Sequence, residues 1–157
     1  MNLKVKPGLG ELLRYLVELV DEAAEDHYRA MNVAYRARYT PVMRALSVGA
    51  ETISDITAST YLTQGAISQS VGLMERDGLI TRYALEDGRK SAVQLTPKGR
   101  ALLKKLEQHW KMTFNTIENL EQEIEYPLLS VLESAARALE NNGFSARLSE
   151  EKKKQQS

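Results

Sequence analysis

The sequence predicts a mainly α-helical protein, in which a central lobe of short helices and one β-hairpin is flanked by long amphipathic helices. Three observations support this fold class. Apolar residues recur at helical spacing near both ends of the chain, threonine helix caps divide its middle, and two β-like runs surround an Asp-Gly turn. With 157 residues, the chain is long enough for one domain whose core needs no disulfide or metal.

The first long helix is expected within residues 8–30. Pro7 and Gly8 mark its start, and apolar side chains recur at helical spacing from Leu9 to Ala24. This apolar stripe is wider than the single buried face of a surface helix. We therefore expect the helix to lie in a core or to be shared with a partner chain. The residues from Asn32 to Tyr39 are expected to form an irregular link.

Two short helices are predicted next. The first should begin with Thr40 as N-cap and Pro41 at the first helical position, and should end at Gly49. The second should begin at Thr52, whose side chain would form a variant of the capping box with Asp55.

A further helix follows a polar break at Ser59–Tyr61. Thr63 is its expected N-cap, and Asp77 and Gly78 end it. Two short helices joined by so brief a turn form a helix-turn-helix. The side chains expected to face inward from these two helices are Ile53, Ile56, Ile67, Val71 and Met74.

The β-like runs Ile80–Ala84 and Ser91–Leu95 follow directly. The residues between them contain Asp87 and Gly88, a turn dipeptide, so the runs should form a hairpin. A hairpin placed directly after a helix-turn-helix is a wing. Residues 40–97 are therefore predicted to form a winged helix-turn-helix lobe.

The second helical arm is expected over residues 98–142. Thr96 and Pro97 repeat the N-cap and first-position proline pattern at its start, and Pro127 should kink or delay its last helix. Residues 143–157 have little to bury and are expected to be a flexible tail. The apolar residues of the arm are Leu103, Leu106, Trp110, Phe114, Ile117, Leu120, Ile124, Leu128, Leu132, Ala135 and Leu139.

Charge is distributed unevenly although the formal net charge is zero. Residues 60–106 carry eight basic and four acidic side chains, and residues 29–48 carry four arginines and no acid. Residues 9–26 and 107–140 are each acidic by five charges. Nucleic-acid binding requires a local basic face and not a basic average. Solvated helix faces would give the same pattern, so charge alone does not decide the function.

These central residues resemble the MarR (multiple antibiotic resistance regulator) family of bacterial transcription factors. The resemblance is closest over Leu62–Arg82 and Glu86–Leu102, and covers the middle half of the chain well. The outer helices resemble the family in length and placement only. The matching residues are Met74, Glu75, Gly78, Leu79, Ile80 and Arg82 in the first segment, and Asp87, Arg89, Leu95, Thr96 and Gly99 in the second.

The polar face of the helix after Thr63 is the main candidate for base contacts. Glutamine can pair with adenine through two hydrogen bonds, and serine can bind bases or phosphates. An ordinary solvated helix face is the alternative. Arg38 and Arg44 are candidates for phosphate contacts, with surface solvation as their alternative. The residues expected to bind DNA are Thr63, Gln64, Gly65, Ser68, Gln69, Arg38, Arg44 and, from the wing, Arg89 and Lys90.

Arg89 should lie at the tip of the hairpin, where a long cation can enter a narrow minor groove. A solvated loop arginine is the alternative, and the resemblance favours DNA contact. Asp87 would be repelled by phosphate. The resemblance implies that Asp87 braces the wing by pairing with an arginine, for which Arg82 is a candidate.

The resemblance also implies that a small aromatic or anionic effector could bind between the arms and the lobe. Core and interface packing is the commoner role of such aromatic residues. The candidate pocket residues are His27, Tyr28, Tyr35, Tyr39, Trp110 and Phe114.

The chain is expected to be a cytoplasmic homodimer that binds a pseudo-palindromic double-stranded DNA operator and represses transcription. We expect no enzymatic activity, cofactor or metal site, because the sequence has no cysteine, no phosphate loop and no metal-ligand spacing. We also expect no membrane span, because Glu11, Arg14 and Glu18 interrupt the apolar residues near the N-terminus. Two alternatives stay open. One is a winged-helix module that binds proteins and no DNA, and the other is an architectural DNA-binding protein without an effector.

Overall fold

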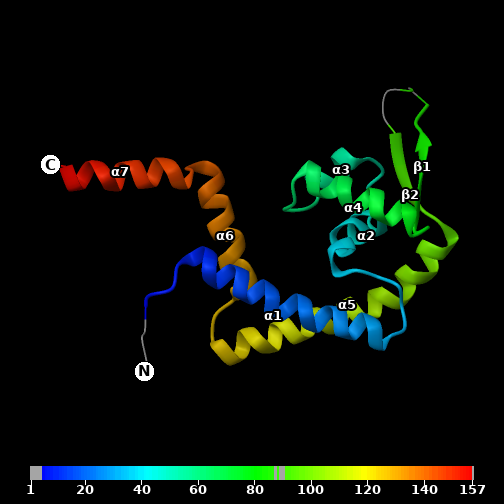
Figure 1. The fold of residues 1–157 in the computed structure, drawn as a ribbon, viewed down its shortest axis with the longest axis horizontal. Helices are drawn as coiled ribbons and strands as arrows, with labels where there is room; N and C mark the ends of the chain where they lie inside the picture. Colours follow the sequence, from blue (N-terminus) through cyan, green and yellow to red (C-terminus); the bar gives the residue numbers. More distant parts are fainter. Residues whose placement is uncertain (1–4, 87, 89–90, 157) are drawn as a thin grey trace. The chain divides into compact units, whose positions relative to one another are not determined.

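The structure is a computed structural model that describes residues 5–86, 88 and 91–156. The chain forms two compact units that divide after Leu106, within a long helix. The first unit contains, in order, α1 (Leu9–Ala30), the 3-10 helix η1 (Ala37–Tyr39), α2 (Thr40–Ser47), α3 (Ile53–Ala58), α4 (Gln64–Arg76), β1 (Ile80–Ala84), β2 (Ser91–Leu95) and the start of α5 (Pro97–Ile124). Figure 1 shows the hairpin projecting from the α2–α4 cluster. The predicted winged helix-turn-helix is confirmed.

Threonine caps define the starts of α3, α4 and α5, as the sequence predicts. The Thr52 side chain accepts a hydrogen bond from the Asp55 amide while the Asp55 carboxylate accepts one from the Thr52 amide. Thr63 accepts from the Ala66 amide, and Thr96 accepts from the Gly99 amide. Each cap satisfies a backbone N–H that the first helical turn leaves unpaired.

The prediction that Thr40 is an N-cap is wrong. Thr40 is already the first residue of α2, and Tyr39 holds the cap position without a side-chain cap bond. The Thr40 hydroxyl is instead 2.8 Å from the hydroxyl of Tyr35. Pro41 lies in the first turn of α2, as expected. The link before it contains η1 and is thus partly helical.

The wing is an antiparallel hairpin in which Ile80 pairs with Leu95 and Ala84 pairs with Ser91. Its strand bounds agree with the sequence prediction. The other edge of β2 is also covered, because Thr52 forms a β-bridge with Ala92. This third short segment was not predicted. It ties the start of α3 to the base of the wing.

The core of the first unit lies between α4, the helices before it and the base of the hairpin. The predicted inward stripe of α4 is fully buried, and Ile56 of α3 is also buried. Ile53 is half-buried. The largest fully buried side chains are Tyr39, Met43, Ile56, Ile67, Met74, Leu79, Leu106, Val42 and Val71.

In the second unit, the rest of α5 is followed by α6 (Leu128–Asn141) and α7 (Phe144–Gln156). Pro127 is the N-cap of α6, which agrees with the predicted delay, and Ile124 closes α5. The prediction of a flexible tail is wrong in its secondary structure, since residues 144–156 are helical. This segment is rich in arginine, alanine, leucine, glutamate, glutamine and lysine, which are strong helix formers. Arg147 also binds the carbonyls of Ala138 and Asn142 at the end of α6.

Both units expose apolar helix faces. Tyr28 is the one buried residue among the 22 of α1, whereas Leu12, Leu16 and Val20 stay exposed. In α6 the apolar residues Leu129, Val131, Leu132 and Leu139 are exposed as well. None of the helices in the described part of the chain combines the length and apolar character that crossing a membrane requires.

Candidate nucleic-acid interface

One face of α4 is polar, small and exposed. Gln64, Gly65, Ser68 and Gln69 are all exposed. Gly65, Ser68 and Gln69 lie opposite the buried stripe of the same helix, and Gln64 is exposed at its first residue. This arrangement follows from the helical period, because residues three to four positions apart lie on the same side of a helix. The predicted base-contacting residues therefore share one accessible surface.

Gly65 and Gly72 have no side chain that projects from this face of α4. A Cβ atom added at Gly65 or at Gly72 would have no neighbour within 4 Å. Gln69 lies between them along the helix, four residues after Gly65 and three before Gly72. Residues at this spacing share one side of a helix. Gln69 therefore has a glycine before it and a glycine after it on this side of α4.

Thr63 begins the helix that carries this face, and Arg38 is bonded to it. The Thr63 hydroxyl is used as the N-cap of α4, so its side chain holds the helix start. The Arg38 Nη2 donates a hydrogen bond to Gln69 Oε1 at 3.2 Å. Arg44 lies exposed in the last turn of α2. The structure thus connects Arg38 directly to the exposed polar face of α4. The sequence did not predict this contact.

The turn between α4 and β1 is held by several contacts. The Tyr39 hydroxyl donates to the Asp77 carboxylate at 2.7 Å, and the Lys98 Nζ donates to the Asp77 carbonyl at 2.9 Å. The Thr96 hydroxyl donates to the Gly78 carbonyl at 2.6 Å. Gly78 has a positive φ of 75°, which suits glycine. These bonds hold the end of α4 in a fixed orientation relative to the start of β1.

The approach of α5 to the same turn is close. A Cβ atom added at Gly99 would lie 2.1 Å from the Leu79 carbonyl oxygen, and Gly99 is buried. The Thr96 amide donates to that same oxygen at 3.0 Å. Only glycine fits at this position without movement of the backbone. The match of Gly99 to the family pattern therefore has a physical cause in this chain.

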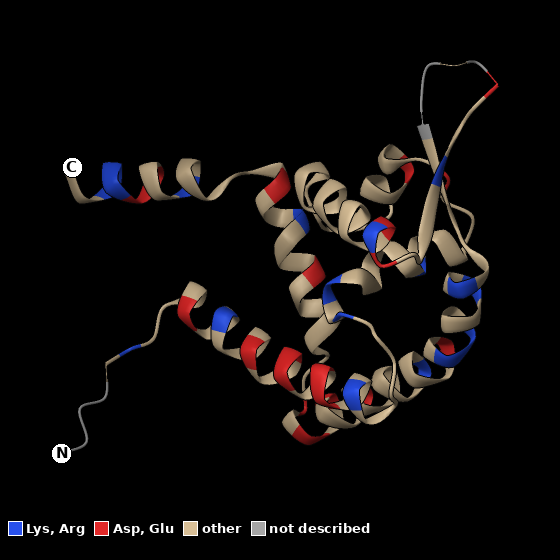
Figure 2. Ribbon diagram, turned by 45° about the vertical axis from the view of Figure 1, so that its right-hand side comes forward, with Lys and Arg blue, Asp and Glu red and all other residues tan. Residues whose placement is uncertain are grey.

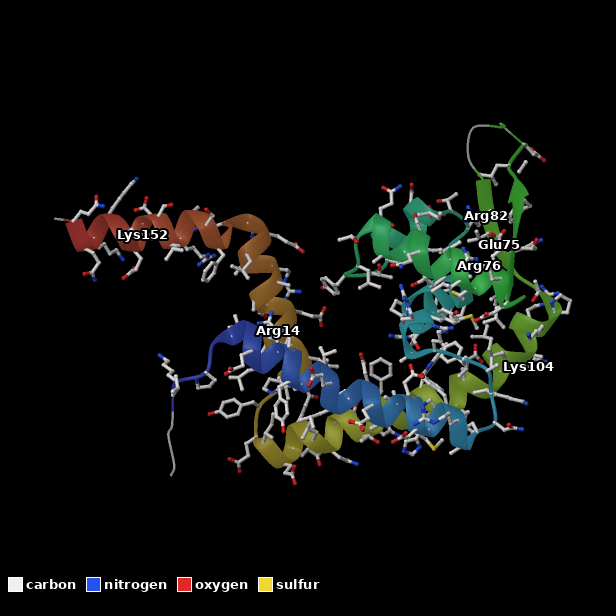
Figure 3. The ribbon with its side chains drawn as sticks, in the orientation of Figure 1. Arg14, Glu75, Arg76, Arg82, Lys104 and Lys152 are labelled. Carbon is white, nitrogen blue, oxygen red and sulfur yellow. The ribbon has the colours of Figure 1, made fainter. Side chains whose placement is uncertain are left out.

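The wing is also bonded to α4. The Arg82 Nε of β1 donates to Glu75 Oε1 at 3.3 Å, and Figure 3 shows these two side chains beside each other. Both side chains are more than a third exposed, so the pair contributes little stability. Its effect is to orient the hairpin. The predicted partner Asp87 and the predicted wing contacts Arg89 and Lys90 lie outside the described residues.

Basic and acidic side chains separate along the first unit. Figure 2 shows acidic residues repeated along α1 and basic residues along the first half of α5. The cations at the start of α5 are engaged within the chain, since Lys98 binds the Asp77 carbonyl and Arg100 binds the Leu95 carbonyl. Both stay exposed. Arg38, by contrast, is bonded to the exposed polar face of α4.

The predicted pocket tyrosines form a packed cluster. The rings of Tyr28 and Tyr35 meet edge to face at 4.7 Å, and those of Tyr35 and Tyr39 do so at 5.8 Å. Burial raises the pKa of Tyr35 well above its ordinary range. Burial, followed by the hydrogen bond to Asp77, raises the pKa of Tyr39 to about 12. These hydroxyls are kept neutral, and those of Tyr35 and Tyr39 are hydrogen-bonded within the first unit.

The other pocket candidates differ. His27 is exposed, and Phe114 is 38% exposed. Trp110 is buried, and its Nε1 has no hydrogen-bond partner in the described part of the chain. No group of three or more histidine, aspartate or glutamate side chains among the described residues could hold a metal ion. The pocket itself stays a prediction.

Sequence reasoning missed the partners that connect elements. Glu25 and the Tyr39–Asp77 bond came from no motif, and Glu75 was expected as part of the family pattern but not as the partner of Arg82. Glu25 accepts a hydrogen bond from the Ala37 amide at 2.8 Å and so ties α1 to η1. Acidic residues in helices are usually solvated, so nothing in their spacing marks them as links.

No protein-family profile and no curated protein matches the sequence. Solved structures do match the fold. A MarR family transcriptional regulator from Silicibacter pomeroyi is 24% identical with a TM-score of 0.65, over 88% of this chain and 99% of that chain. The transcriptional regulator BldR from Sulfolobus solfataricus is 20% identical with a TM-score of 0.59, over 85% and 93%. MepR from S. aureus, solved in complex with DNA, is 19% identical with a TM-score of 0.59, over 82% and 96%. The chain has the winged helix-turn-helix fold of the MarR family transcriptional regulators.

Proposed function

We propose that this chain is a homodimeric, sequence-specific DNA-binding regulator of transcription that acts in the cytoplasm as a repressor. The observation that carries the proposal is the exposed face of α4, where Gln64, Ser68 and Gln69 project from a helix that the wing flanks. A helix with such a face fits the major groove of B-DNA, and amide and hydroxyl groups can read base edges there.

The fold likeness supports the same proposal. MepR from S. aureus has this fold and was solved on DNA. The exposed apolar faces of α1 and α6 support a dimer, because a single chain leaves them in water. A two-fold axis would place two α4 helices about one DNA turn apart, roughly 34–36 Å, and would require a pseudo-palindromic operator.

The proposal also includes a small-molecule effector that releases the protein from DNA. The buried Trp110 Nε1 has no acceptor in the described part of the chain, so a carboxylate or another acceptor on a small aromatic ligand would satisfy it. Such a ligand releases DNA only if it favours a dimer state whose recognition helices are wrongly spaced. A thermal-shift screen of aromatic acids, followed by measurement of operator affinity, tests this part. A ligand that stabilises the protein without weakening operator binding would exclude the switch.

The salt dependence of duplex binding tests the main proposal. Affinity should fall steeply as salt rises, because each phosphate that a cation neutralises releases counterions. Duplexes from the DNA beside the gene and scrambled duplexes of equal length should be titrated in parallel. Tighter binding to one sequence supports the proposal. Absence of binding to every duplex at low salt would favour a winged-helix module for protein partners.

A further inference from the structure

The pairing of Arg38 with Gln69 has a consequence for base recognition. The Arg38 guanidinium lies against the oxygen of the Gln69 amide at 3.2 Å. Arginine carries only donors, so it can bind the amide through its oxygen alone. The NH2 group of the Gln69 amide is on the other branch of the same planar group and is therefore directed away from Arg38.

Arg38 is itself well held. It lies in η1 between Ala37, whose amide binds Glu25 of α1, and Tyr39, whose hydroxyl binds Asp77 at the end of α4. Tyr39 is completely buried. The backbone on both sides of Arg38 is thus anchored to separate helices. The Arg38 side chain therefore extends toward α4 from a backbone position that is held in place.

The space around the Gln69 side chain is open. Gly65 and Gly72 lie on the same side of α4, and a Cβ atom at either position would touch nothing within 4 Å. A base edge can therefore approach the amide closely. The groups that it meets first are the Gln69 NH2 and the N–H groups of Arg38 that do not bind Gln69, and all of these are donors.

We infer that Arg38 makes Gln69 a reader of guanine and not of adenine, a conclusion that rests on the proposed DNA binding. A free glutamine pairs with adenine by donating to N7 and accepting from the N6 amino group. Here the amide oxygen is held by a cation, and the cation repels the adenine amino group. Guanine presents two acceptors, O6 and N7, which complement a surface of donors. Arg38 thus sets the specificity of Gln69, and its remaining N–H groups add to the same surface of donors.

The test uses the full-length protein and a library of randomised duplexes. Selection with wild-type protein yields the preferred sequence, and selection with Gln69→Ala identifies the position that Gln69 reads. Duplexes with each of the four bases at that position are then titrated with wild type, Arg38→Ala, Arg38→Lys and Arg36→Ala. Arg36 is an exposed arginine two residues away and serves as a control for loss of the same charge.

The wild type should prefer guanine to adenine at this position. Arg38→Ala should lower the ratio of guanine to adenine affinity about fivefold or more, since one good base contact is at stake. Arg38→Lys keeps a cationic donor and should retain the preference. Arg36→Ala should change binding to all four duplexes by one common factor, because loss of a positive charge affects attraction to the phosphate backbone independently of sequence.

Two outcomes would overturn the inference while the proposed function stands. One is that Arg38→Ala weakens all four duplexes equally, which would make Arg38 a phosphate contact. The other is that Gln69→Ala changes preference at no position although specific binding persists. Failure of the wild type to bind any duplex would instead remove the proposed function, and this inference with it. In the free protein, Arg38→Ala should shift the Gln69 side-chain NH2 resonances, and unchanged resonances would contradict the pairing.

Discussion

Single residues hold the recognition helix α4 in register with the wing and with η1. Asp77 accepts bonds through its carboxylate from Tyr39 and through its carbonyl from Lys98, and Gly99 lets α5 approach the Leu79 carbonyl. Few of these contacts are strong when taken alone, because a hydrogen bond contributes about 1 kcal/mol net. Their value is geometric, since they converge on one turn of three residues.

Replacement of Gly99 by alanine should destabilise the protein by about 1–3 kcal/mol or more. The added Cβ would lie 2.1 Å from a backbone oxygen, so α5 or β1 must move. Gly72→Ala is the matched control. It adds the same methyl group in open space within a helix and should stabilise the protein by about 0.5–1 kcal/mol. Urea unfolding of the two variants measures the difference, and equal stabilities would contradict the close approach at Gly99.

Tyr39 should make the stability depend on pH in the alkaline range. Its pKa is raised from the ordinary 10.0 to about 12 in the folded protein. The folded state therefore favours the neutral hydroxyl, and this stabilisation is complete below pH 10 and is lost as pH rises through about 12.

Tyr39→Phe should cost about 1 kcal/mol at neutral pH through the lost bond to Asp77. It should also reduce the further loss of stability as pH rises from 10.0 through about 12, because the titrating group is gone. Denaturant unfolding at several pH values checks both effects. The same alkaline loss in variant and wild type would show that Tyr39 does not contribute to it.

At the scale of elements, α4 and the wing are expected to contact DNA in different ways. In the proposed complex the exposed amides of α4 would face the major groove, whose donor and acceptor pattern differs for every base pair. A wing arginine that enters the minor groove senses width and potential more than base identity. The bonds from Arg82 to Glu75 and from Thr96 to Gly78 hold these two elements together.

Arg89→Ala should therefore weaken binding to operator and scrambled DNA together. Loss of one phosphate-like contact per chain should flatten the salt slope by about one unit. Binding of the variant to both duplexes across a series of salt concentrations measures this change. An unaltered slope with full affinity would mean that the wing does not contact DNA.

Gln64→Ala should act differently. It should cost about 1–3 kcal/mol on the operator and leave binding to scrambled DNA nearly unchanged, since only base contacts are lost. Gln64 is exposed, so the fold should be unaffected. Equal weakening on both duplexes in a fluorescence titration would argue that Gln64 binds the backbone and not a base.

Local chemistry explains which elements could be predicted from the sequence. Thr52, Thr63 and Thr96 cap helices through bonds that span three residues, so the pattern is visible in the chain itself. Thr40 has the same pattern, but the tyrosine hydroxyl of Tyr35 takes its side chain away from the cap. That competition is tertiary. The pairing of Arg38 with Gln69 spans 31 positions and has no local signature.

The helix α7 was not predicted from the sequence. A segment with little to bury was expected to be flexible, yet strong helix formers and the contacts of Arg147 with the end of α6 favour a helix. The exposed face of the recognition helix was predictable because the buried stripe of Ile67, Val71 and Met74 fixes which side is left for a partner.

At the scale of the whole molecule, the apolar surface of α1 determines the assembly that we propose. Leu12, Leu16 and Val20 remain exposed in the single chain, and contiguous apolar surface of this kind marks an interface. A second copy would cover it and would supply the second recognition helix. Affinity for a pseudo-palindrome would then depend on the dimer.

Leu16→Arg should shift the protein from dimer to monomer. An unpaired charge in an apolar interface costs several kcal/mol, whereas Leu16 is already 42% exposed within its own chain, so the lobe should stay folded. Glu18→Gln, a polar change on the same helix, should leave the dimer intact. Light scattering at micromolar concentration, with circular dichroism to verify folding, decides the matter. A dimeric Leu16→Arg variant would place the interface elsewhere.

A footprint of the wild-type protein on its selected duplex tests the central claim most directly. A dimer that reads DNA through two α4 helices should protect two half-sites whose centres lie about 10–10.5 base pairs apart on one face of the duplex, with two chains bound per site. Protection of a single half-site by one chain, or no protection of any selected duplex, would contradict the account.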